Sequence, residues 1–382
     1  MSIQTIVIAV VTSAVVGSSA AFFVARVATL SLGNAGTPQI DQRVAQRMMR
    51  DMMAVDDEAG LPLRTPRDRV ATLASSVVDG VREFQLTAEP IRWEYADGRT
   101  ILAWGYNGQI PGPEIRVTEG ERVRFVFMNR LPKATTVHWH GLDVPNSQDG
   151  VPGLTQEPVA PGATFTYEFV ASPAGTHFYH THGSVHGDEA QQLDMGLSGA
   201  FIVEPRGYER PSREFTLVLD EWQVAPMGSS NGPSMANMAM GGAGHSMAYN
   251  LYTVNGRSFP ATEPLEVAKG DRVRMRLING GTSTTHPMHL HGHQFRIVAV
   301  DGNAVPSAAQ LTRNTVTLHP GETYDVEFVA ENPGVWLFHC HELHHADGGM
   351  IVPLRYEGFA MPVIREEESS APAGVHRIQR HL

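Results

Sequence analysis

The sequence of 382 residues contains a single cysteine, Cys340. One cysteine excludes a disulfide within the chain, so the thiol is free for metal, and cysteine usage says nothing about the redox compartment. Basic residues are also in short supply: 29 Lys and Arg against 40 Asp and Glu give a formal net charge of −11. That balance argues against a nucleic-acid backbone as the main partner.

Glycine, proline and histidine are plentiful instead. The chain has 37 Gly and 25 Pro, with short alternating apolar runs between turn residues, and this pattern favours an all-β fold. The length alone predicts two to three domains. Many of the 18 histidines stand in tight clusters.

The N-terminal region is expected to direct the chain out of the cytoplasm. Ile6–Ala25 is apolar or small and uncharged, and a run of about 20 such residues can span a bilayer. A secretory signal is the other interpretation, although no positive segment precedes it; a buried helix is the third. We therefore predict a signal peptide or membrane anchor over residues 1–30 and an extracytoplasmic protein, periplasmic or secreted. Residues 31–83 are expected to form a helical and linker arm, with a methionine-bearing helix at 39–59.

From residue 84 onward the strand pattern occurs twice. Val117–Val123 and Val267–Val273 each carry an apolar position, a Gly-acid turn and an Arg-Val strand start. In both units a histidine cluster, a Pro-Gly turn, a T-x-x-x-x-F strand and another histidine cluster follow. This is a duplicated β-sandwich. We expect domains at 84–206 and 213–358, a short join between them and a peripheral tail at 359–382.

Each unit supplies two H-x-H pairs. They are His138 with His140, His180 with His182, His289 with His291, and His339 with His341. Side chains alternate along a strand, so both imidazoles of a pair lie on one face. A single H-x-H motif could be a feature of the core, but four such motifs placed by a duplication predict metal binding. Eight imidazoles are too many for one ion and suit a cluster of about three.

The stretch around Cys340 has a different chemistry. On an extended strand Cys340 points away from His339 and His341. His345 and Met350 follow, and His286 stands three residues before His289. Two His, a Cys thiolate and a weak Met ligand are the set of a blue-copper centre. An electron on that copper could pass through Cys340 and its neighbours to metals on the opposite face.

A methionine-rich segment, residues 227–247, is inserted in the second unit. It contains Met235, Met238, Met240 and His245 among Gly, Ser and Asn. Its composition predicts a flexible loop, and thioethers are soft ligands for Cu(I). An insertion with no metal role is the alternative.

With these motifs the chain resembles the multicopper oxidases. The matching stretches are HWHG at 138–141, HFYHTH at 177–182, HPMHLHG at 286–292, HCHELHHADGGM at 339–350 and the Tyr106–Pro113 loop. The resemblance covers residues 84–357, and it is closest to the two-domain, small laccase-like branch, because no middle domain separates the halves. It implies two tandem cupredoxin-like Greek-key β-sandwich domains.

The resemblance also implies four coppers per active unit and a role for each ligand. The type 1 copper would be held by His286, Cys340, His345 and axial Met350; the type 2 copper by His138 and His289; one type 3 copper by His140, His180 and His341; the other by His182, His291 and His339. Asp149 matches the family's acidic residue that assists proton delivery, or else it is a turn residue before Gly150. The first unit lacks Cys, so only the second can hold type 1 copper.

The implied activity is one-electron oxidation of a reducing substrate coupled to four-electron reduction of O2 to water. Phenols and aromatic amines, or low-valent metal ions such as Cu(I), are the two substrate classes. A copper nitrite reductase and a non-catalytic copper-binding or tolerance protein are the alternatives. Two-domain relatives imply that the first domain meets the second domain of a neighbouring chain, which predicts a homotrimer.

Overall fold

The computed structural model describes residues 61–65, 70–185, 187–224 and 249–362. The expected N-terminal anchor, the helix at 39–59, the methionine-rich segment and most of the tail lie outside these residues. Within the described ranges, no helix has the length and apolar character that a membrane crossing requires.

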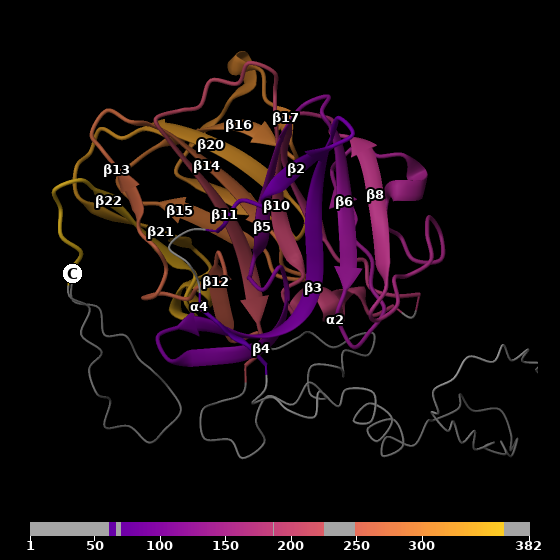
Figure 1. Cartoon of the computed structure of the whole chain (residues 1–382). Coiled ribbons are helices and arrows are strands. Elements are labelled where there is room, and N and C mark those ends of the chain that lie inside the picture. The colour runs from indigo at the N-terminus through magenta and orange to yellow at the C-terminus, as the bar shows by residue number, and fades with distance from the viewer. Residues whose placement is uncertain (1–60, 66–69, 186, 225–248, 363–382) are drawn as a thin grey trace, which may run out of the picture. The chain divides into compact units, whose positions relative to one another are not determined.

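The first domain is a sandwich of two sheets, drawn in indigo to magenta in Figure 1. One sheet has six strands and the other has four, in the order β5-β10-β9-β7. The strands are β1 (Leu63–Arg64), β2 (Ser75–Val78), β3 (Val81–Ala96), β4 (Arg99–Tyr106), β5 (Gly112–Thr118), β6 (Arg122–Asn129), β7 (His138–His140), β8 (Thr164–Val170), β9 (Gly175–His180) and β10 (Ser198–Glu204). The short helices η2 (Asn146–Gln148) and α2 (Glu189–Asp194) lie in the loops.

The second domain repeats this plan with sheets of seven and five strands, the latter in the order β13-β22-β21-β15-β19. Its strands are β11 (Arg213–Trp222), β12 (Leu251–Val254), β13 (Leu265–Val267), β14 (Arg272–Asn279), β15 (His286–Leu290), β16 (Phe295–Val300), β17 (Asn303–Ala304), β18 (Thr312–Arg313), β19 (Thr315–Leu318), β20 (Thr323–Val329), β21 (Val335–Cys340) and β22 (Ile351–Tyr356). Helices η3 (Ser307–Ala309) and α4 (Leu343–Asp347) complete it.

Alternating side chains build each core. In β6, Val123, Phe125 and Phe127 are fully buried while the residues between them are partly exposed. The Phe125 ring packs against Trp139 of the facing sheet, and all three side chains belong to one hydrophobic cluster. The all-β prediction with two cupredoxin-like sandwiches is confirmed.

The stretch expected to be a linker arm contributes strands to the first domain. Both β1 and β2 pair with β3, which itself begins at Val81 rather than near Phe84. Thr72 makes a further bridge to Glu114 at the edge of β5. The alternating pattern before residue 84 is too short and too interrupted by Pro62 and Pro66 to predict these pairings, which long β3 makes possible.

Candidate metal centres

The end of β21 places Cys340 among the two histidines predicted to share its metal. The Cys340 Sγ lies 3.8 Å from Nδ1 of His286 and 3.6 Å from Nδ1 of His345. The two Nδ1 atoms are 3.2 Å apart. All three residues are buried, and their potential ligand atoms lie within 4.8 Å of one another. His286 therefore meets two residues that lie more than fifty positions further along the sequence.

Met350 lies next to this group. It is fully buried, its N–H donates to the His345 carbonyl, and its own carbonyl accepts from the Cys340 N–H at 3.1 Å. On the other side Tyr252 stacks on the His345 ring at a centroid distance of 4.1 Å. The backbone hydrogen bond between Cys340 and Met350 ties the two ends of this segment together, and the Tyr252 ring packs on His345 in its middle.

The donor set fits copper. A thiolate with two imidazoles is a soft, mixed S/N set, and in this geometry such a set is typical of blue copper rather than of a structural zinc. Burial raises the pKa of the Cys340 thiol to about 12. The metal-free thiol is therefore protonated at neutral pH, and metal binding must release that proton.

A buried carboxylate orients the first of these imidazoles. Oε2 of Glu221, which has no exposed surface, lies 3.2 Å from Nε2 of His286. Its other oxygen accepts three backbone N–H groups, those of Thr282, Ser283 and Thr284. Burial alone would raise the pKa of Glu221, but the hydrogen bond with His286, together with those from the backbone N–H groups, outweighs it and lowers the pKa. The ionised carboxylate accepts a hydrogen bond from Nε2–H of His286, which leaves the unprotonated Nδ1 facing Cys340.

The second imidazole has a similar partner that is open to solvent. Nε2 of His345 lies 3.2 Å from Oε2 of Glu342, whose side chain is 38% exposed. Sequence reasoning missed both carboxylates. The adjacent pair Asp220 and Glu221 in the otherwise apolar strand Leu217–Trp222 was the available signal, since acidic residues in a buried strand need a partner.

The first domain brings together its own histidines. Potential ligand atoms of His138, His140 and His180 lie within 4.8 Å of one another. Nδ1 of His138 donates to the Asp149 carbonyl at 2.7 Å, and Nδ1 of His180 donates to the Thr181 carbonyl at 2.7 Å. A carbonyl can only accept, so these bonds fix the tautomer and leave Nε2 available to a metal.

The second domain repeats this arrangement. Nδ1 of His289 donates to the Asn314 carbonyl at 2.8 Å, and Nδ1 of His339 donates to the Cys340 carbonyl at 2.8 Å. Nε2 of His291 lies 3.0 Å from Nε2 of His339, and the rings of His289 and His341 are 5.5 Å apart. All four predicted histidines of this domain therefore form one group.

Burial holds His140, His180 and His339 in the neutral form. Burial, with His138 nearby, lowers the pKa of His140 to about 4 and that of His180 to about 3. Burial likewise lowers the pKa of His339 to about 4. Neutral imidazole is the form that coordinates a metal.

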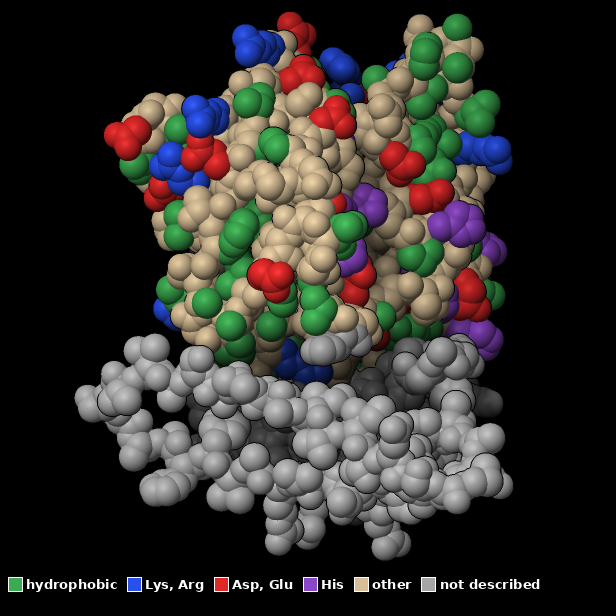
Figure 2. Space-filling view, turned by 90° about the vertical axis from the view of Figure 1, so that its right-hand side faces the viewer, with side chains coloured by type: hydrophobic (Ala, Val, Ile, Leu, Met, Phe, Trp, Pro, Cys, Tyr) green, Lys and Arg blue, Asp and Glu red, His purple; other side chains and the backbone are tan. Residues whose placement is uncertain are grey.

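The first-domain histidines line a recess. A recess of about 390 Å³ beside the first group is lined by His138, His140, His180 and His182. Its other walls include Asn279–Thr282 and Pro320–Gly321 of the second domain. Neither stretch contains a histidine, and every histidine among the described lining residues comes from the first domain. On the face shown in Figure 2, histidine side chains reach the surface near the middle and along one edge.

Asp149 contacts one of the predicted cluster histidines. One side-chain oxygen is 3.3 Å from Nδ1 of His138, and the side chain is 32% exposed. Gly150 follows with φ +83, and a Cβ there would collide with the Val137 carbonyl. The turn and the contact with His138 are therefore both present.

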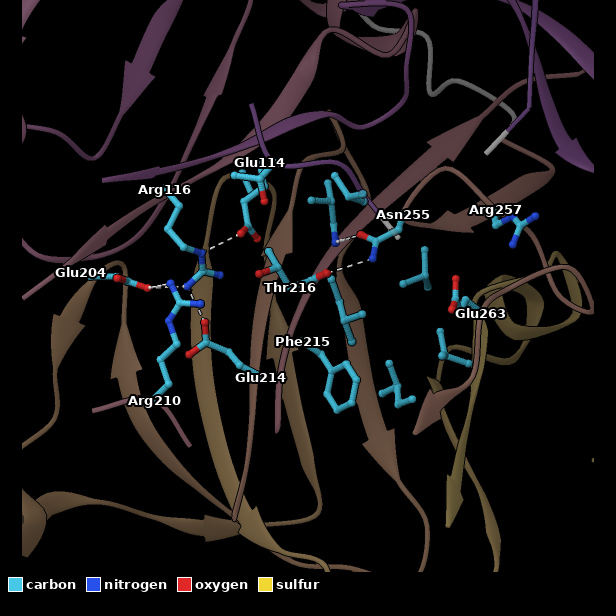
Figure 3. Close-up of a pocket in the computed structure, with 18 of the residues that line it drawn as sticks. Glu114, Arg116, Glu204, Arg210, Glu214, Phe215, Thr216, Asn255, Arg257 and Glu263 are labelled. Atoms are coloured by element: carbon cyan, nitrogen blue, oxygen red, sulfur yellow. Dashed lines mark hydrogen bonds and ion pairs between the residues drawn. The ribbon is translucent and has the colours of Figure 1, made fainter. Parts of the chain in front are cut away.

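A cavity of about 640 Å³ lies away from these groups, between the domains (Figure 3). Its charged lining is largely paired with itself: Arg116 contacts Glu114 at 2.8 Å, Glu204 at 2.9 Å and Glu214 at 2.6 Å. Arg210 also pairs with Glu204. These residues hold the domains together rather than offering unpaired charge to a ligand.

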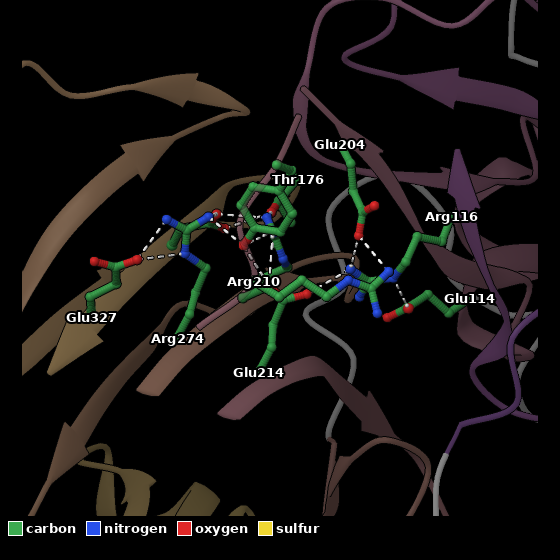
Figure 4. A network of polar contacts seen from close by, with 11 residues as sticks. Glu114, Arg116, Thr176, Glu204, Arg210, Glu214, Arg274 and Glu327 are labelled. Carbon is green, nitrogen blue, oxygen red and sulfur yellow. Dashed lines mark hydrogen bonds and ion pairs between the residues drawn. The ribbon is translucent and has the colours of Figure 1, made fainter. Parts of the chain in front are cut away.

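The same ion pairs continue into a buried network, drawn in Figure 4. Arg276, 3% exposed, donates to Asp325 and to Thr176 of the first domain, each at 2.7 Å. Burial would raise the pKa of Glu214, but Arg276 and its other partners lower it to about 2. An apolar patch of Phe178, Ala200, Ile202, Val218 and Ile278 also joins the domains. The interface is thus fixed by charge and by packing.

Comparison with known proteins agrees with this geometry. Two family profiles, both described as multicopper oxidase, match residues 87–207 and 229–358. The chain belongs to the multicopper oxidase family. Among curated relatives, the multicopper oxidase MmcO of Mycobacterium tuberculosis is 30% identical over 268 residues, covering 64% of this chain and 51% of that protein. Laccase-15 of Oryza sativa subsp. japonica is 32% identical over 241 residues, covering 59% and 38% respectively. The chain thus spans about half or less of these relatives.

Solved multicopper oxidases have a similar fold over most of their length. The blue copper oxidase of Nitrosomonas europaea is 35% identical with a TM-score of 0.62, covering 72% of this chain and 86% of that one. The multicopper oxidase mgLAC is 32% identical with a TM-score of 0.64, covering 75% and 90%. A copper nitrite reductase from N. europaea, 23% identical with a TM-score of 0.59 and coverage of 72% and 93%, shares the fold alone.

Proposed function

We propose that this multicopper oxidase takes single electrons from a reducing substrate at a type 1 copper and uses four of them to reduce O2 to two waters at a three-copper cluster. The observation that carries the proposal is the His339-Cys340-His341 strand. Cys340 belongs to the buried Cys–His group, while its two neighbours belong to the histidine group on the other face.

The bound coppers would supply the electron transfer and the oxygen chemistry. The protein's residues fix where each donor atom points: Glu221 and Glu342 bind the Nε2 side of His286 and His345, and backbone carbonyls bind the Nδ1 side of the cluster histidines. A histidine held in one tautomer needs no rearrangement when a metal enters or changes charge. Asp149, next to His138, would hand a proton toward the cluster.

We propose further that the cluster is completed between chains. The recess beside the first-domain histidines is walled by residues 279–282 and 320–321 of the same chain's second domain, none of which is histidine. The missing imidazoles would come from the second domain of a neighbouring copy. Such a head-to-tail contact closes into a ring, and we propose a homotrimer.

The donor is proposed to be either a phenolic compound or a low-valent metal ion, Cu(I) in particular. The exposed carboxylate of Glu342 beside His345 suits both, because it can accept a phenol's proton or attract a cation. The methionine-rich residues 227–247 favour Cu(I), since thioethers bind it. Excising them should slow Cu(I) oxidation more than phenol oxidation; equal effects on both would show that these residues do not select the donor.

A copper nitrite reductase is the second candidate. A Kuenenia stuttgartiensis protein named as a probable nitrite reductase-hydroxylamine oxidoreductase fusion is 32% identical over 287 residues, covering 71% of this chain and 31% of its own. Nitrite reduction needs far fewer histidines than the eight paired here. The Cys340 group in the second domain also departs from that family's first-domain type 1 site.

Oxygen uptake separates these functions. The copper-loaded protein should consume one O2 for every four electrons taken from a phenolic donor or from Cu(I), without releasing hydrogen peroxide. Reduction of nitrite with no oxygen uptake would favour the nitrite reductase, and copper binding with neither activity would favour a carrier.

The place of action is proposed to be extracytoplasmic, with the apolar Ile6–Ala25 as signal or anchor. Fractionation of cells that express the full chain would test this. Recovery of the active protein in the cytoplasmic fraction would contradict it.

A further inference from the structure

The first-domain histidine His182 has a carboxylate at its Nδ1, whereas His138 has both the Asp149 carboxylate and the Asp149 backbone carbonyl there. Nδ1 of His182 lies 3.3 Å from Oε2 of Glu189, the first residue of α2. The Nδ1 atoms of His180, His289 and His339 face backbone carbonyls instead. His182 is therefore oriented by a charged side chain, which a substitution can remove.

The loop between the two residues is built to make this contact. Gly183 has φ +66, and a Cβ there would lie 2.7 Å from the backbone nitrogen of Glu189. Asp188 accepts from the Ser184 N–H at 2.7 Å and from Gln192 at 3.0 Å. Only a glycine at 183 lets the chain fold back this closely, and Asp188 then holds it closed.

Glu189 also faces the recess that the histidines line. His182 and Glu189 are both among its lining residues, with side chains 29% and 40% exposed. The ring of His182 lies 5.7 Å from that of His138. A carboxylate on Nδ1 keeps the proton there, so that Nε2 carries the free lone pair, and it makes that nitrogen a stronger donor.

We infer that Glu189 is a positioning residue for the copper cluster, acting through His182 as acceptor of its Nδ1 proton. The inference rests on the proposed four-copper function and adds a residue to it. Glu189 contacts no copper itself. Its removal would free His182 to rotate and to place its proton on either nitrogen, and part of the population would then present N–H to the metal.

The test measures copper binding rather than turnover. Full-length Glu189→Ala, Glu189→Gln and wild type are titrated with copper against a competing chelator, and copper per chain is counted alongside the blue absorption. The exposed Glu209→Gln is the matched control. Glu189→Ala should weaken cluster copper binding by about 10- to 100-fold, with the blue site intact in the other domain. Glu189→Gln, which keeps an accepting oxygen, should recover most of that loss.

Three results would overturn the inference: unchanged copper affinity in Glu189→Ala, loss of blue copper together with cluster copper, or a Glu189→Gln variant as weak as Glu189→Ala. Failure of the proposed function itself looks different. In that case the wild type would bind only the blue copper, and there would be no cluster affinity to compare.

Discussion

The two domains present the same scaffold with different contents at one position. The pairing of His138 with His180 in the first domain corresponds to that of His289 with His339 in the second. By this register Thr135 and Thr181 occupy the places of His286 and Cys340. Their hydroxyl oxygens lie 2.9 Å apart, and Thr181 donates to Gln192 at 3.0 Å.

The two domains therefore have different contacts between the ends of these paired strands. Thr135, Thr181 and Gln192 are all fully buried and satisfy one another by hydrogen bonds. His286 and Cys340, equally buried, leave a sulfur and a nitrogen facing each other that only a metal would join strongly. In the first domain, hydrogen bonds among buried side chains thus stand where the second domain has metal donors.

Replacing the metal donor should have the largest effect. Cys340→Ser removes the thiolate, so the intense blue absorption and oxidase turnover should both be abolished. The cluster histidines do not depend on sulfur, and the type 2 copper signal in electron paramagnetic resonance should survive. Retained blue colour would show that another residue holds that copper.

Breaking the tie between the domains should come next in size. Arg276→Met leaves Asp325, which is 4% exposed, without its main partner. Breaking a buried ion pair in this way lowers the free energy of unfolding by roughly 3–5 kcal/mol. Urea unfolding measures the loss. The double variant Arg276→Met/Asp325→Leu should regain much of it; equal stability of the single and wild-type proteins would show that the network contributes little.

One substitution removes the hydrogen bonds that the first domain has in the place of the copper donors. Thr181→Val keeps the shape of the side chain but removes the hydroxyl that donates to Oε1 of Gln192 and accepts from the Gly183 N–H, at a cost of about 1–3 kcal/mol. The exposed Thr317→Val is the control. The free energies of unfolding of the two variants and the wild type are compared in the metal-free state. In the copper-loaded state the blue absorption of Thr181→Val should equal that of the wild type. A cost no larger than that of the control would mean that the hydrogen bonds are dispensable.

The smallest expected effect is a pH dependence where the domains meet. Burial raises the pKa of Asp194 from 3.8 to about 6, against hydrogen bonds from Thr282 and Tyr249. The folded state therefore binds the proton of the Asp194 carboxyl more tightly than the unfolded state does. The stability that this protonated carboxyl contributes is fully present below pH 4 and is lost as the pH rises to 6. Relative to Asp194→Asn, the wild type should lose stability over that interval in chemical denaturation. Parallel curves would contradict the assignment.

Much of the site could be predicted from the sequence because its donors stand on strands. Alternation of side chains places His339 and His341 on one face and Cys340 on the other, and the duplication repeats the histidine pairs. The structure gathers Cys340 with His286 and His345 as predicted. The fold class followed from the same period-2 patterns.

The supporting carboxylates could not be found in this way. Glu221 reaches His286 across 65 residues, and Glu189 reaches His182 only because of a tight loop at Gly183. The pairing of β1 and β2 with β3, and the Arg276 network, likewise depend on how distant segments pack. A local pattern can mark an unusual residue such as Glu221, but it does not identify the distant residue that it contacts.

The central claim, a cluster shared between chains, is tested most directly by complementation. His140→Ala removes a cluster ligand in the first domain, and His291→Ala removes one in the second. Each variant alone should bind blue copper but reduce no oxygen. Co-assembled in equal amounts, they should regain about a quarter of wild-type oxygen uptake, since one interface in four then joins two intact halves. A mixture as inactive as its parts, from rings shown to contain both variants, would place the whole cluster within one chain and contradict the account.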